Sequence, residues 1–321
     1  MPKKSILITG ATGFVGSHLV EYILKNHLEY EVLGMRRWKS KTNETAYENP
    51  QINYIDCELR NFNQVDEILQ TIKPVKIFHL AAQSFVPTSW KAPQETLETN
   101  IIGQCNLLES ALKLKPMPVI QIAGSSEEYG LIKPNETPIT EKQPLRPLSP
   151  YAVSKIGQDF LGYQYFKSYG LPVIRTRAFN HTGPRRGEQF VCSNFAKQIA
   201  MIEKKKKKPV IEVGDLTSIR DFTDVRDIVR AYWLATEKCQ HGKIYNIASG
   251  KGIQISEVLK ILLSFSAQKI QIKTDPARLR PSDVKILIGN ATRFRKATGW
   301  KPEIPFKKTM QDLLEYWRIN V

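Results

Sequence analysis

Short apolar runs alternate with longer amphipathic stretches through the first 180 residues of the chain. Residues 75–80 form a nearly continuous apolar run, as expected for a strand buried on both faces of a parallel sheet. In residues 64–72 the apolar side chains instead recur at helical spacing. The predicted strands are residues 5–9, 30–34, 52–55, 75–80, 119–123 and 173–177, and the predicted helices are residues 15–24, 64–72, 96–114 and 151–169. This order predicts an α/β fold with a Rossmann-like, doubly wound parallel sheet.

After about residue 180 the pattern is looser, and prolines separate shorter elements. The strands and helices expected there are residues 210–213, 227–236, 255–264, 270–272 and 310–317. We therefore predict a cofactor-binding Rossmann domain over residues 1–180. Residues 181–321 are expected to form a smaller mixed α/β region that mainly binds the substrate and is partly interleaved with the Rossmann core.

The composition is that of a globular protein, with 41 % apolar residues in 321. The longest apolar stretches are too short for a transmembrane helix. The four cysteines are far apart and have no metal-ligand spacing, so we expect a cytoplasmic protein without a metal site or a disulfide framework. The formal charge of +16 raises the question of an acidic partner, which could be nucleic acid, a membrane or a phosphorylated small molecule.

A glycine-rich segment lies between the first predicted strand and the first predicted helix. Its sequence is Gly10-Ala-Thr12-Gly13-Phe14-Val15-Gly16. Glycines at this place let the backbone turn tightly and approach a pyrophosphate, which the helix N-terminus also attracts. Thr12, Phe14 and Val15 belong to the same predicted cofactor loop. The alternative is that the glycines only permit close packing of the helix on the strand.

The end of the second predicted strand carries cations where an NAD-binding protein would have an acid. Arg36 and Arg37, followed by Lys39, suit the 2′-phosphate of NADP, since a guanidinium can bind phosphate oxygens in a bidentate manner. We therefore predict NADP, against the alternative of a solvated basic loop. Asp56 is expected beside the adenine. The list of predicted cofactor contacts at the end of the fourth strand is Leu80, Ala81, Ala82, Gln83 and Ser84.

Tyr151 and Lys155 are four residues apart, so they lie on one face of the predicted helix. A nearby cation lowers the pKa of a phenol and helps it to act as an acid or base. Ser125 and Glu127 follow the strand at residues 119–123, and the carboxyl end of a parallel strand faces the ligand crevice. Ser125 could bind a sugar oxygen and Glu127 could move a proton. An ordinary amphipathic helix is the alternative explanation for the Tyr151 and Lys155 pair.

These motifs resemble those of the extended short-chain dehydrogenase/reductase family over essentially the whole chain. Within that family the sequence is most similar to the GDP-mannose 4,6-dehydratases and the related GDP-4-keto-6-deoxy-mannose reductases. The matching segments are residues 79–84, 125–130, 149–155, 180–188 and 280–283. The segment at 180–188 is the one most specific to enzymes of GDP-sugars.

The resemblance implies a role for each matching residue. Tyr151 would take the proton of the sugar 4-hydroxyl, Lys155 would hold the nicotinamide ribose, and Ser125 would bind O4. Glu127 would serve as the acid/base for loss of water across C5 and C6. His181 and Arg186 match positions near the cofactor. The residues expected at the substrate are Ser84, Ser125, Asn180, Asn194, Arg220 and Arg280; for Arg220 a surface ion pair with Asp221 or Asp224 is the alternative.

The choice between dehydratase and reductase stays open at this point. Asn194 stands where the dehydratases usually have a lysine, and residues 220–233 and 125–130 look more like the reductases. The run Arg185 to Glu188 favours the dehydratases, which we take as the first hypothesis. A 4-reductase acting on GDP-4-keto-6-deoxy-mannose or a GDP-6-deoxy-heptose is the alternative.

The resemblance also implies a homodimer or a homotetramer, the dimer formed by the helices at 96–114 and 151–169 and the tetramer by the loop at 185–188. A nucleic-acid partner would explain the charge, but no recognised binding motif is present. A catalytically silent nucleotide-binding scaffold would lack the Tyr151 and Lys155 pair. We expect a GDP-sugar substrate and neither a nucleic-acid nor a membrane partner, with part of the positive charge serving two phosphorylated small molecules.

Overall fold

A computed structural model describes residues 3–37, 47–278 and 284–321 of the chain. Its central feature is a seven-stranded parallel sheet with the order β10-β6-β5-β4-β1-β2-β3. The predicted Rossmann-like sheet is therefore confirmed. The strands are β1 (Lys4–Thr9), β2 (Tyr30–Arg36), β3 (Asn53–Asp56), β4 (Lys76–His79), β5 (Val119–Ser125), β6 (Val173–Ala178) and β10 (Ile244–Ile247).

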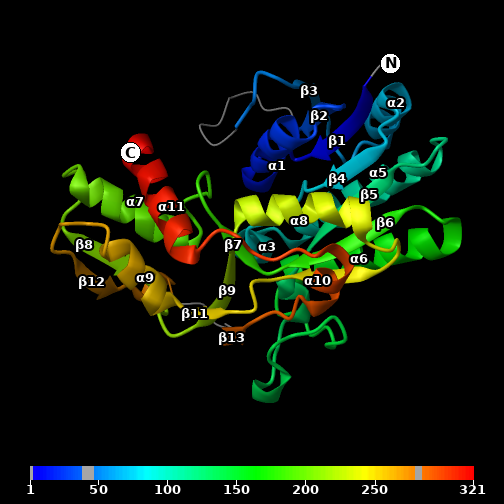
Figure 1. Cartoon of the computed structure of the whole chain (residues 1–321). Helices are drawn as coiled ribbons and strands as arrows, with labels where there is room; N and C mark the ends of the chain where they lie inside the picture. Colours follow the sequence, from blue (N-terminus) through cyan, green and yellow to red (C-terminus); the bar gives the residue numbers. More distant parts are fainter. Residues whose placement is uncertain (1–2, 38–46, 279–283) are drawn as a thin grey trace.

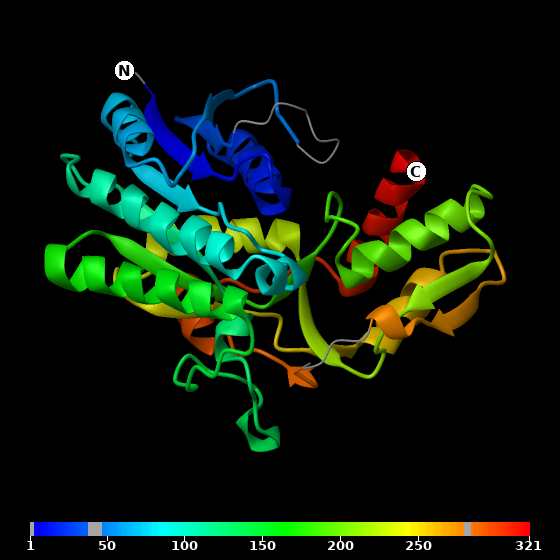
Figure 2. The same cartoon turned by 180° about the vertical axis from the view of Figure 1, so that it is seen from behind.

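Helices cover both faces of this sheet. The face toward the viewer in Figure 1 is covered by α1 (Phe14–Asn26), α8 (Val225–Lys238) and α10 (Thr292–Thr298). The opposite face, in front in Figure 2, is covered by α2 (Phe62–Ile72), α5 (Gly103–Leu112) and α6 (Pro150–Tyr169). Two apolar cores result, one on each side of the strands, and the all-buried pattern of β4 and β6 matches their central position.

One edge of the sheet comes from beyond the first 180 residues. The strand β10 pairs with β6, and α8 packs against α1, although both lie in the region that the sequence assigns mainly to the substrate. The prediction contained no strand at 244–247. The helix predicted at 96–114 is three consecutive pieces, α4 (Pro93–Leu97), the π-helical η1 (Glu98–Ile102) and α5, and it ends two residues earlier.

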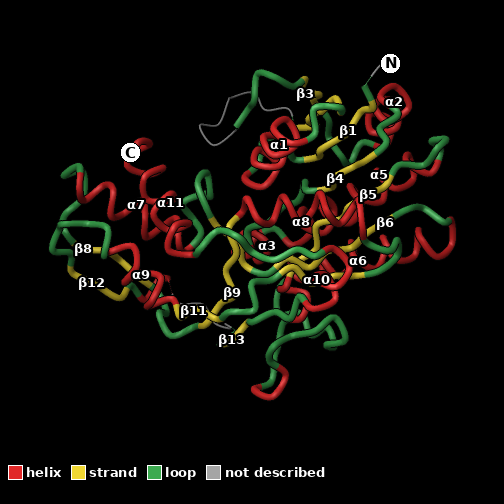
Figure 3. The backbone as a smooth tube through the Cα atoms, viewed as in Figure 1, coloured by secondary structure: helices red, strands yellow, loops and turns green. Residues whose placement is uncertain are grey.

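The rest of the second half forms a smaller lobe beside the carboxyl ends of the strands (Figure 3). Its apolar core lies among α7 (Val191–Glu203), α9 (Ile255–Leu263), α11 (Phe306–Asn320) and β8 (Val210–Val213). The strand β8 pairs with β12 (Gln271–Thr274), and β9 (Ile219–Asp224) pairs with β7 (Asn180–Thr182), β11 (Gly252–Gln254) and β13 (Ile286–Leu287). The other short elements are α3 (Val86–Lys91), η2 (Ser126–Tyr129), η3 (Pro134–Glu136) and η4 (Pro276–Arg278).

The ends of α6 are set by its sequence. Ser149 caps the first turn, since its hydroxyl accepts the N–H of Ala152 at 3.1 Å, and Pro150 occupies the first helical position, which needs no N–H donor. Gly170 ends the helix in the left-handed conformation, with φ of +72°. Tyr151 and Lys155 are thereby fixed in its first two turns, next to the end of β5.

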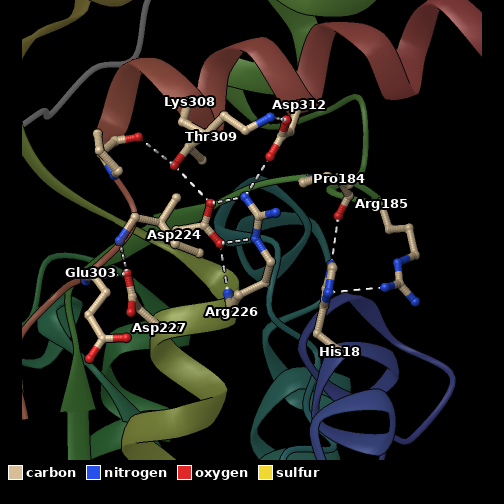
Figure 4. Close-up of polar contacts among 12 residues, drawn as sticks. His18, Pro184, Arg185, Asp224, Arg226, Asp227, Glu303, Lys308, Thr309 and Asp312 are labelled. Atoms are coloured by element: carbon tan, nitrogen blue, oxygen red, sulfur yellow. Dashed lines mark hydrogen bonds and ion pairs between the residues drawn. The ribbon is translucent and has the colours of Figure 1, made fainter. Parts of the chain in front are cut away.

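A buried carboxylate joins the sheet side of the molecule to the C-terminal helix (Figure 4). Asp224, at the end of β9, caps α8 by accepting the N–H of Arg226 at 2.8 Å, and it also accepts the guanidinium of Arg226 at 2.7 Å. The hydroxyl of Thr309 on α11 donates to the same carboxylate at 2.8 Å, and Arg226 continues to Asp312 of α11 at 2.8 Å. The lobe is thus tied to α8 by charge-assisted hydrogen bonds.

The substitution Asp224→Ala is expected to lower the free energy of unfolding by about 3 kcal/mol, because it leaves Arg226 and Thr309 without this buried acceptor. The measurement is urea denaturation followed by circular dichroism. Asp215→Ala is the control, since Asp215 is exposed and accepts from its close neighbours in sequence, Thr217 and Ser218; its cost is expected to stay below about 1 kcal/mol. Equal losses in the two variants would contradict the assignment.

Candidate active site

The glycine-rich loop is folded tightly against the start of α1. A Cβ on Gly16 would lie 2.2 Å from the carbonyl oxygen of Gly10, and Gly10 itself has φ of +70°. The Gly10 N–H donates to the carbonyl of Met35 at 2.9 Å, which joins the loop to β2. Gly13 stands at the N-cap of α1 and brings no side chain over it. This loop therefore has the form of a cradle for phosphate at a helix N-terminus.

The segment after β4 passes very close to this loop. A Cβ on Gly10 would lie 3.0 Å from Cα of Ala81, and the hydroxyl of Thr9 accepts the N–H groups of Leu80 and Ala81 at 3.2 and 3.1 Å. The N–H of Gln83 donates to the Asn100 side chain at 2.8 Å. The predicted stretch from Leu80 to Ser84, including Ala82, thus lines the same edge of the sheet as the glycine loop.

The predicted adenosine-side residues contact one another. Arg36 and Asp56 face each other across β2 and β3, and their side chains form an ion pair at 2.8 Å. Arg36 also pairs with Glu48, and its guanidinium lies 5.5 Å from the ring centre of Tyr54. Arg36 could therefore bind a phosphate only by exchanging carboxylate partners, whereas Arg37 is exposed. Lys39 falls outside the described residues.

Tyr151, Lys155 and Ser125 meet where β5 ends beside α6. The Lys155 ammonium lies 5.9 Å from the ring centre of Tyr151 and donates to the carbonyl of Ala123 at 2.9 Å. Burial raises the pKa of Tyr151, while a hydrogen bond with Ser125 lowers that pKa. Burial also lowers the pKa of Lys155 to about 8. The pKa values of the phenol and the amine, which are ordinarily close to each other, are therefore moved apart, and the pKa of Tyr151 is not lowered as the spacing to Lys155 predicted. Two neighbouring titratable groups perturbed in this way are a candidate acid/base centre.

Glu127 belongs to this centre. Its N–H donates to the hydroxyl of Ser125 at 3.2 Å, and its negative charge contributes to the raised pKa of Tyr151. Glu127 is half-buried, unlike its neighbour Glu128, which is completely buried. The sequence-predicted quartet of Ser125, Glu127, Tyr151 and Lys155 is therefore brought together by β5, η2 and α6.

A second group of predicted residues gathers above the start of α1. The His181 ring stacks on Phe14 with centres 6.0 Å apart, and Arg186 lies over the rings of Phe14 and Phe190 at 4.8 and 3.4 Å. Burial and the charge of Arg186 lower the pKa of His181 to about 4, so this imidazole is neutral at pH 7. Burial lowers the pKa of Arg186 to about 10, and the charge of Tyr151 opposes that shift. A cation is thus held beside both the loop and Tyr151.

The loop that carries Arg186 is anchored by residues that the sequence reasoning missed. The ring of His18 on α1 hydrogen-bonds the carbonyl of Pro184 at 2.9 Å and the Arg185 guanidinium at 3.0 Å (Figure 4). Arg185 also pairs with Glu21. Burial and Arg185 lower the pKa of His18 to about 4. The spacing of 166 residues between His18 and Pro184 leaves no local signal by which the sequence could reveal this contact.

Two of the predicted substrate residues, Asn180 and Asn194, lie on elements of the smaller lobe. Asn194 on α7 accepts from Gln198 at 2.8 Å and from Arg278 at 3.0 Å. Asn180 on β7 lies opposite Phe222 in the register of β7 and β9. Arg278, which sequence reasoning did not single out, brings a guanidinium to Asn194. Arg280 lies outside the described residues.

Arg220 is on β9, and its guanidinium donates to the carbonyls of Ile219 and Lys285 at 3.0 and 3.4 Å. The carboxylate of Asp221 accepts instead from the Ser249, Gly250 and Gly289 backbone N–H groups at 2.9 to 3.1 Å. Asp224 is engaged by Arg226 and Thr309, as described above. These contacts give Asp221 and Asp224 structural functions of their own.

Among the residues that the structure describes, no group of three metal-ligating side chains could hold an ion. The same residues include no helix that is long and apolar enough to cross a membrane.

Comparison with known proteins places this site in a class. The glycine loop before α1, with the Tyr151 and Lys155 pair on α6, defines an enzyme of the short-chain dehydrogenase/reductase type. The family model described as GDP-mannose 4,6 dehydratase matches residues 7–313, and the chain belongs to that family. It is therefore an enzyme of the sugar-nucleotide dehydratase and reductase group, as the sequence resemblance predicted.

Individual relatives cover the whole chain. The GDP-6-deoxy-D-mannose reductase of Pseudomonas aeruginosa is 32 % identical over 319 residues, which are 99 % of this chain and 98 % of that protein. A GDP-mannose 4,6-dehydratase of Vibrio cholerae is 30 % identical over 353 residues, covering 98 % of this chain and 93 % of that protein. The structure of RMD from P. aeruginosa complexed with NADPH is 30 % identical in sequence and superposes with a TM-score of 0.86. The match covers 99 % of this chain and 100 % of that chain.

Proposed function

We propose that the protein is an NADP-dependent GDP-sugar 4,6-dehydratase that converts GDP-mannose into GDP-4-keto-6-deoxy-mannose. The observation that carries this proposal is the position of Glu127, whose N–H bonds Ser125 and whose charge acts on Tyr151. Reduction of a ketone needs a hydride donor and one proton donor, which Tyr151 could supply alone. Elimination of water across C5 and C6 needs a further acid/base, and Glu127 provides that group in the same site.

The residues of the cofactor loop fit NADP. Gly10 and Gly16 leave space that a Cβ would fill, Gly13 adds no side chain over the helix N-terminus, and Arg37 is an exposed cation at the end of β2. We propose that Gly10, Gly13 and Gly16 hold the pyrophosphate and that Arg37 binds the 2′-phosphate. The NADPH in the structure of the P. aeruginosa protein supports this choice. NADP held by these residues would supply the acceptor for the hydride of C4 and the donor of that hydride to C6.

In the proposed mechanism, different side chains carry out the different proton transfers. Tyr151 takes the proton of the 4-hydroxyl as C4 becomes a ketone, while Lys155 stabilises the phenolate and Ser125 holds O4. Glu127 takes the proton from C5 and gives it to the C6 hydroxyl, which departs as water. One proton then returns to C5, which balances the proton that Tyr151 removed from the 4-hydroxyl. The sum is the loss of one water, with no net oxidation of the sugar.

For the diphosphate of GDP-mannose we propose Arg220, Arg280 and Asn180, with Asn194 nearer the base and Ser84 near the sugar. Guanidinium groups suit a pyrophosphate because they bind two oxygens at once. His181 and Arg186 would lie at the nicotinamide side, since both gather at Phe14 above the glycine loop.

A second candidate is a 4-ketoreductase acting on GDP-4-keto-6-deoxy-mannose or a GDP-6-deoxy-heptose. The alignment with the V. cholerae dehydratase is longer than this chain of 321 residues, so that protein contains segments that are missing here. The alignment with the P. aeruginosa reductase has almost exactly the length of both proteins. Asn194, in place of the lysine usual in dehydratases, points the same way.

The two candidates differ in whether reducing equivalents are consumed. The test is incubation of the purified protein with catalytic NADP and GDP-mannose, followed by chromatography and NMR of the product. The dehydratase is expected to form the 4-keto-6-deoxy sugar without any added reductant. If no product forms, but NADPH is oxidised with GDP-4-keto-6-deoxy-mannose, the reductase is the correct assignment.

We also propose a homodimer rather than a homotetramer. The exposed apolar side chains Ile102, Val153 and Phe160 lie on η1 and α6, two elements in contact with each other. Such a face is costly in water and suits burial against a second copy. The loop that the resemblance connects with tetramers uses its charges within the chain, since Arg185 pairs with Glu21 and Glu188 with Lys197.

Phe160→Glu is expected to convert the dimer into a monomer, because a carboxylate would be buried in the two-fold contact. Sedimentation velocity measures the change. Ile319→Glu is the control, since Ile319 is also exposed but lies on α11, and this variant is expected to stay dimeric. A tetrameric wild-type protein, or a Phe160→Glu variant that remains dimeric, would contradict this assignment.

A further inference from the structure

Four charged side chains are buried together behind the proposed catalytic residues. Glu128 has no exposed surface, Asp159 is 2 % exposed, Arg177 is 5 % exposed and Arg175 is 9 % exposed. They carry two negative and two positive charges, so the group as a whole is neutral. Moving charges out of water is expensive even when they are paired. Such a cluster at this position calls for an explanation beyond stability.

Arg177 is the centre of the cluster. Its Nε donates to one oxygen of Glu128 at 2.7 Å, its Nη2 donates to Asp159, and its guanidinium lies 4.8 Å from the ring centre of Tyr129. Arg175 donates to the other oxygen of Asp159 at 2.5 Å. The cluster joins β6, α6 and η2, so Glu128 is held against β6 of the central sheet.

The second oxygen of Glu128 reaches the active site. It accepts the backbone N–H of Ser125 at 2.8 Å, and the hydroxyl of Ser125 in turn accepts the N–H of Glu127 at 3.2 Å. A Cβ at residue 124 would lie 2.6 Å from this carboxylate oxygen, so Gly124 leaves the space that Glu128 occupies. The carboxylate therefore fixes the turn that presents both Ser125 and Glu127.

Glu128 is also the buried negative charge that acts on Lys155. Burial lowers the pKa of Lys155, and the charge of Glu128 is what opposes that shift. Burial and the charge of Asp159 raise the pKa of Glu128, and the Arg177 guanidinium, which donates to this carboxylate at 2.7 Å, opposes that rise. The other titratable or charged groups facing Glu128 and Lys155 are Arg177 on β6, Tyr151 and Asp159 on α6, Glu127 and Tyr129 on η2, and His79 on β4, which burial keeps neutral.

We propose that Glu128, held by Arg177, is a positioning residue that fixes the Ser125–Glu127 turn and supplies the counter-charge of Lys155. The inference rests on the proposed function, because it assigns Glu128 a role in the same site. Without the carboxylate, the N–H of Ser125 loses its acceptor, and Lys155 loses the negative charge that opposes the lowering of its pKa. The expected consequence is a change in turnover and in its pH dependence rather than in substrate affinity.

Glu128→Gln tests the charge while keeping an oxygen for Ser125. Loss of the charge lowers the pKa of Lys155, so the lysine becomes neutral at a lower pH and the alkaline limb of kcat moves to lower pH. The acid limb moves in the same direction, because the charge of Glu128 also raises the pKa of Tyr151. We expect the whole profile to shift by about one pH unit toward acid, with KM for the sugar nucleotide changed less than about twofold.

Glu128→Leu combined with Arg177→Met covers the case in which the single variant does not fold. It removes the ion pair as a unit and leaves Asp159 paired with Arg175, so no buried charge is left alone. Since Ser125 loses its anchor, kcat is expected to fall by about 100-fold. Glu141→Gln is the matched control, because Glu141 is a largely buried carboxylate that accepts the N–H of Asn246 at 2.9 Å; its pH profile should equal that of the wild type.

Two results together would overturn the positioning role. The first is a folded double variant with the kcat of the wild type, and the second is an unshifted pH profile of Glu128→Gln. Failure of the proposed function gives a different result, namely a wild-type protein that turns over neither GDP-mannose nor the 4-keto sugar. In that event the pH dependence of NADPH binding, followed by its fluorescence, replaces turnover as the measurement. A shift toward acid in Glu128→Gln would then support the coupling to Lys155, and equal curves would contradict it.

Discussion

Replacing Tyr151 by phenylalanine is expected to lower kcat by about 10³-fold while NADPH still binds. In the proposed mechanism the phenol moves the proton of the sugar 4-hydroxyl, and the ring without its hydroxyl cannot do so. Tyr151 is only 8 % exposed, and its hydrogen-bond partner Ser125 stays in place. The substitution removes one oxygen from a packed site, so the fold is expected to persist. Steady-state turnover and fluorescence titration with NADPH measure the two effects separately.

The control for this variant is Tyr163→Phe on the same helix. Tyr163 is 41 % exposed and lies about three turns further along α6 than Tyr151. Its kcat is expected to stay within about twofold of the wild type. If Tyr151→Phe retained more than a tenth of the wild-type kcat, the phenol could not be the principal proton carrier.

Gly16→Ala is expected to weaken NADPH binding by about 100-fold. The new Cβ would lie 2.2 Å from the Gly10 carbonyl and 2.7 Å from Cα of Ala11, so the backbone of the loop must move by about 1 Å to admit it. The loop would then no longer present its N–H groups to the pyrophosphate. The midpoint of thermal unfolding is expected to fall as well, because the same contact strains the protein without its ligand.

Gly13→Ala separates these effects. Among the residues that the structure describes, its Cβ would meet only the Gly10 carbonyl oxygen, at 3.2 Å, and its φ of −79° suits any residue. The unfolding midpoint of this variant is therefore expected to equal that of the wild type. Fluorescence titration and thermal denaturation of both variants are the measurements. An unchanged NADPH affinity in Gly16→Ala would show that the loop does not hold the cofactor.

The part of the fold that depends on local pattern is predictable from the sequence. The strands at 5–9 and 119–123 agree with β1 and β5, since buried apolar runs between amphipathic helices have few other solutions. The strand β10 could not be assigned, because its four residues form an edge strand whose partner, β6, is about 70 positions earlier in the chain. A segment of four residues without apolar–polar alternation carries no signal of that pairing.

The candidate site is likewise only partly predictable from the sequence. Tyr151 and Lys155 are one helical turn apart, so sequence spacing alone places them together. Arg36 was predicted to be free for phosphate, but it is paired with Asp56, because β2 continues two residues further than predicted and brings both residues into register. Glu128 was overlooked because a charged residue in sequence is normally exposed, and only the tertiary structure shows its buried partners.

The most direct test of the proposed function follows the hydrogen on C4. GDP-mannose carrying deuterium at C4 is incubated with the protein and catalytic NADP, and the product is examined by NMR and mass spectrometry. A dehydratase is predicted to give GDP-4-keto-6-deoxy-mannose with the deuterium at C6, since the same hydride leaves C4 and returns to C6 within one site. Unchanged GDP-mannose, or a product without deuterium at C6, would contradict the account.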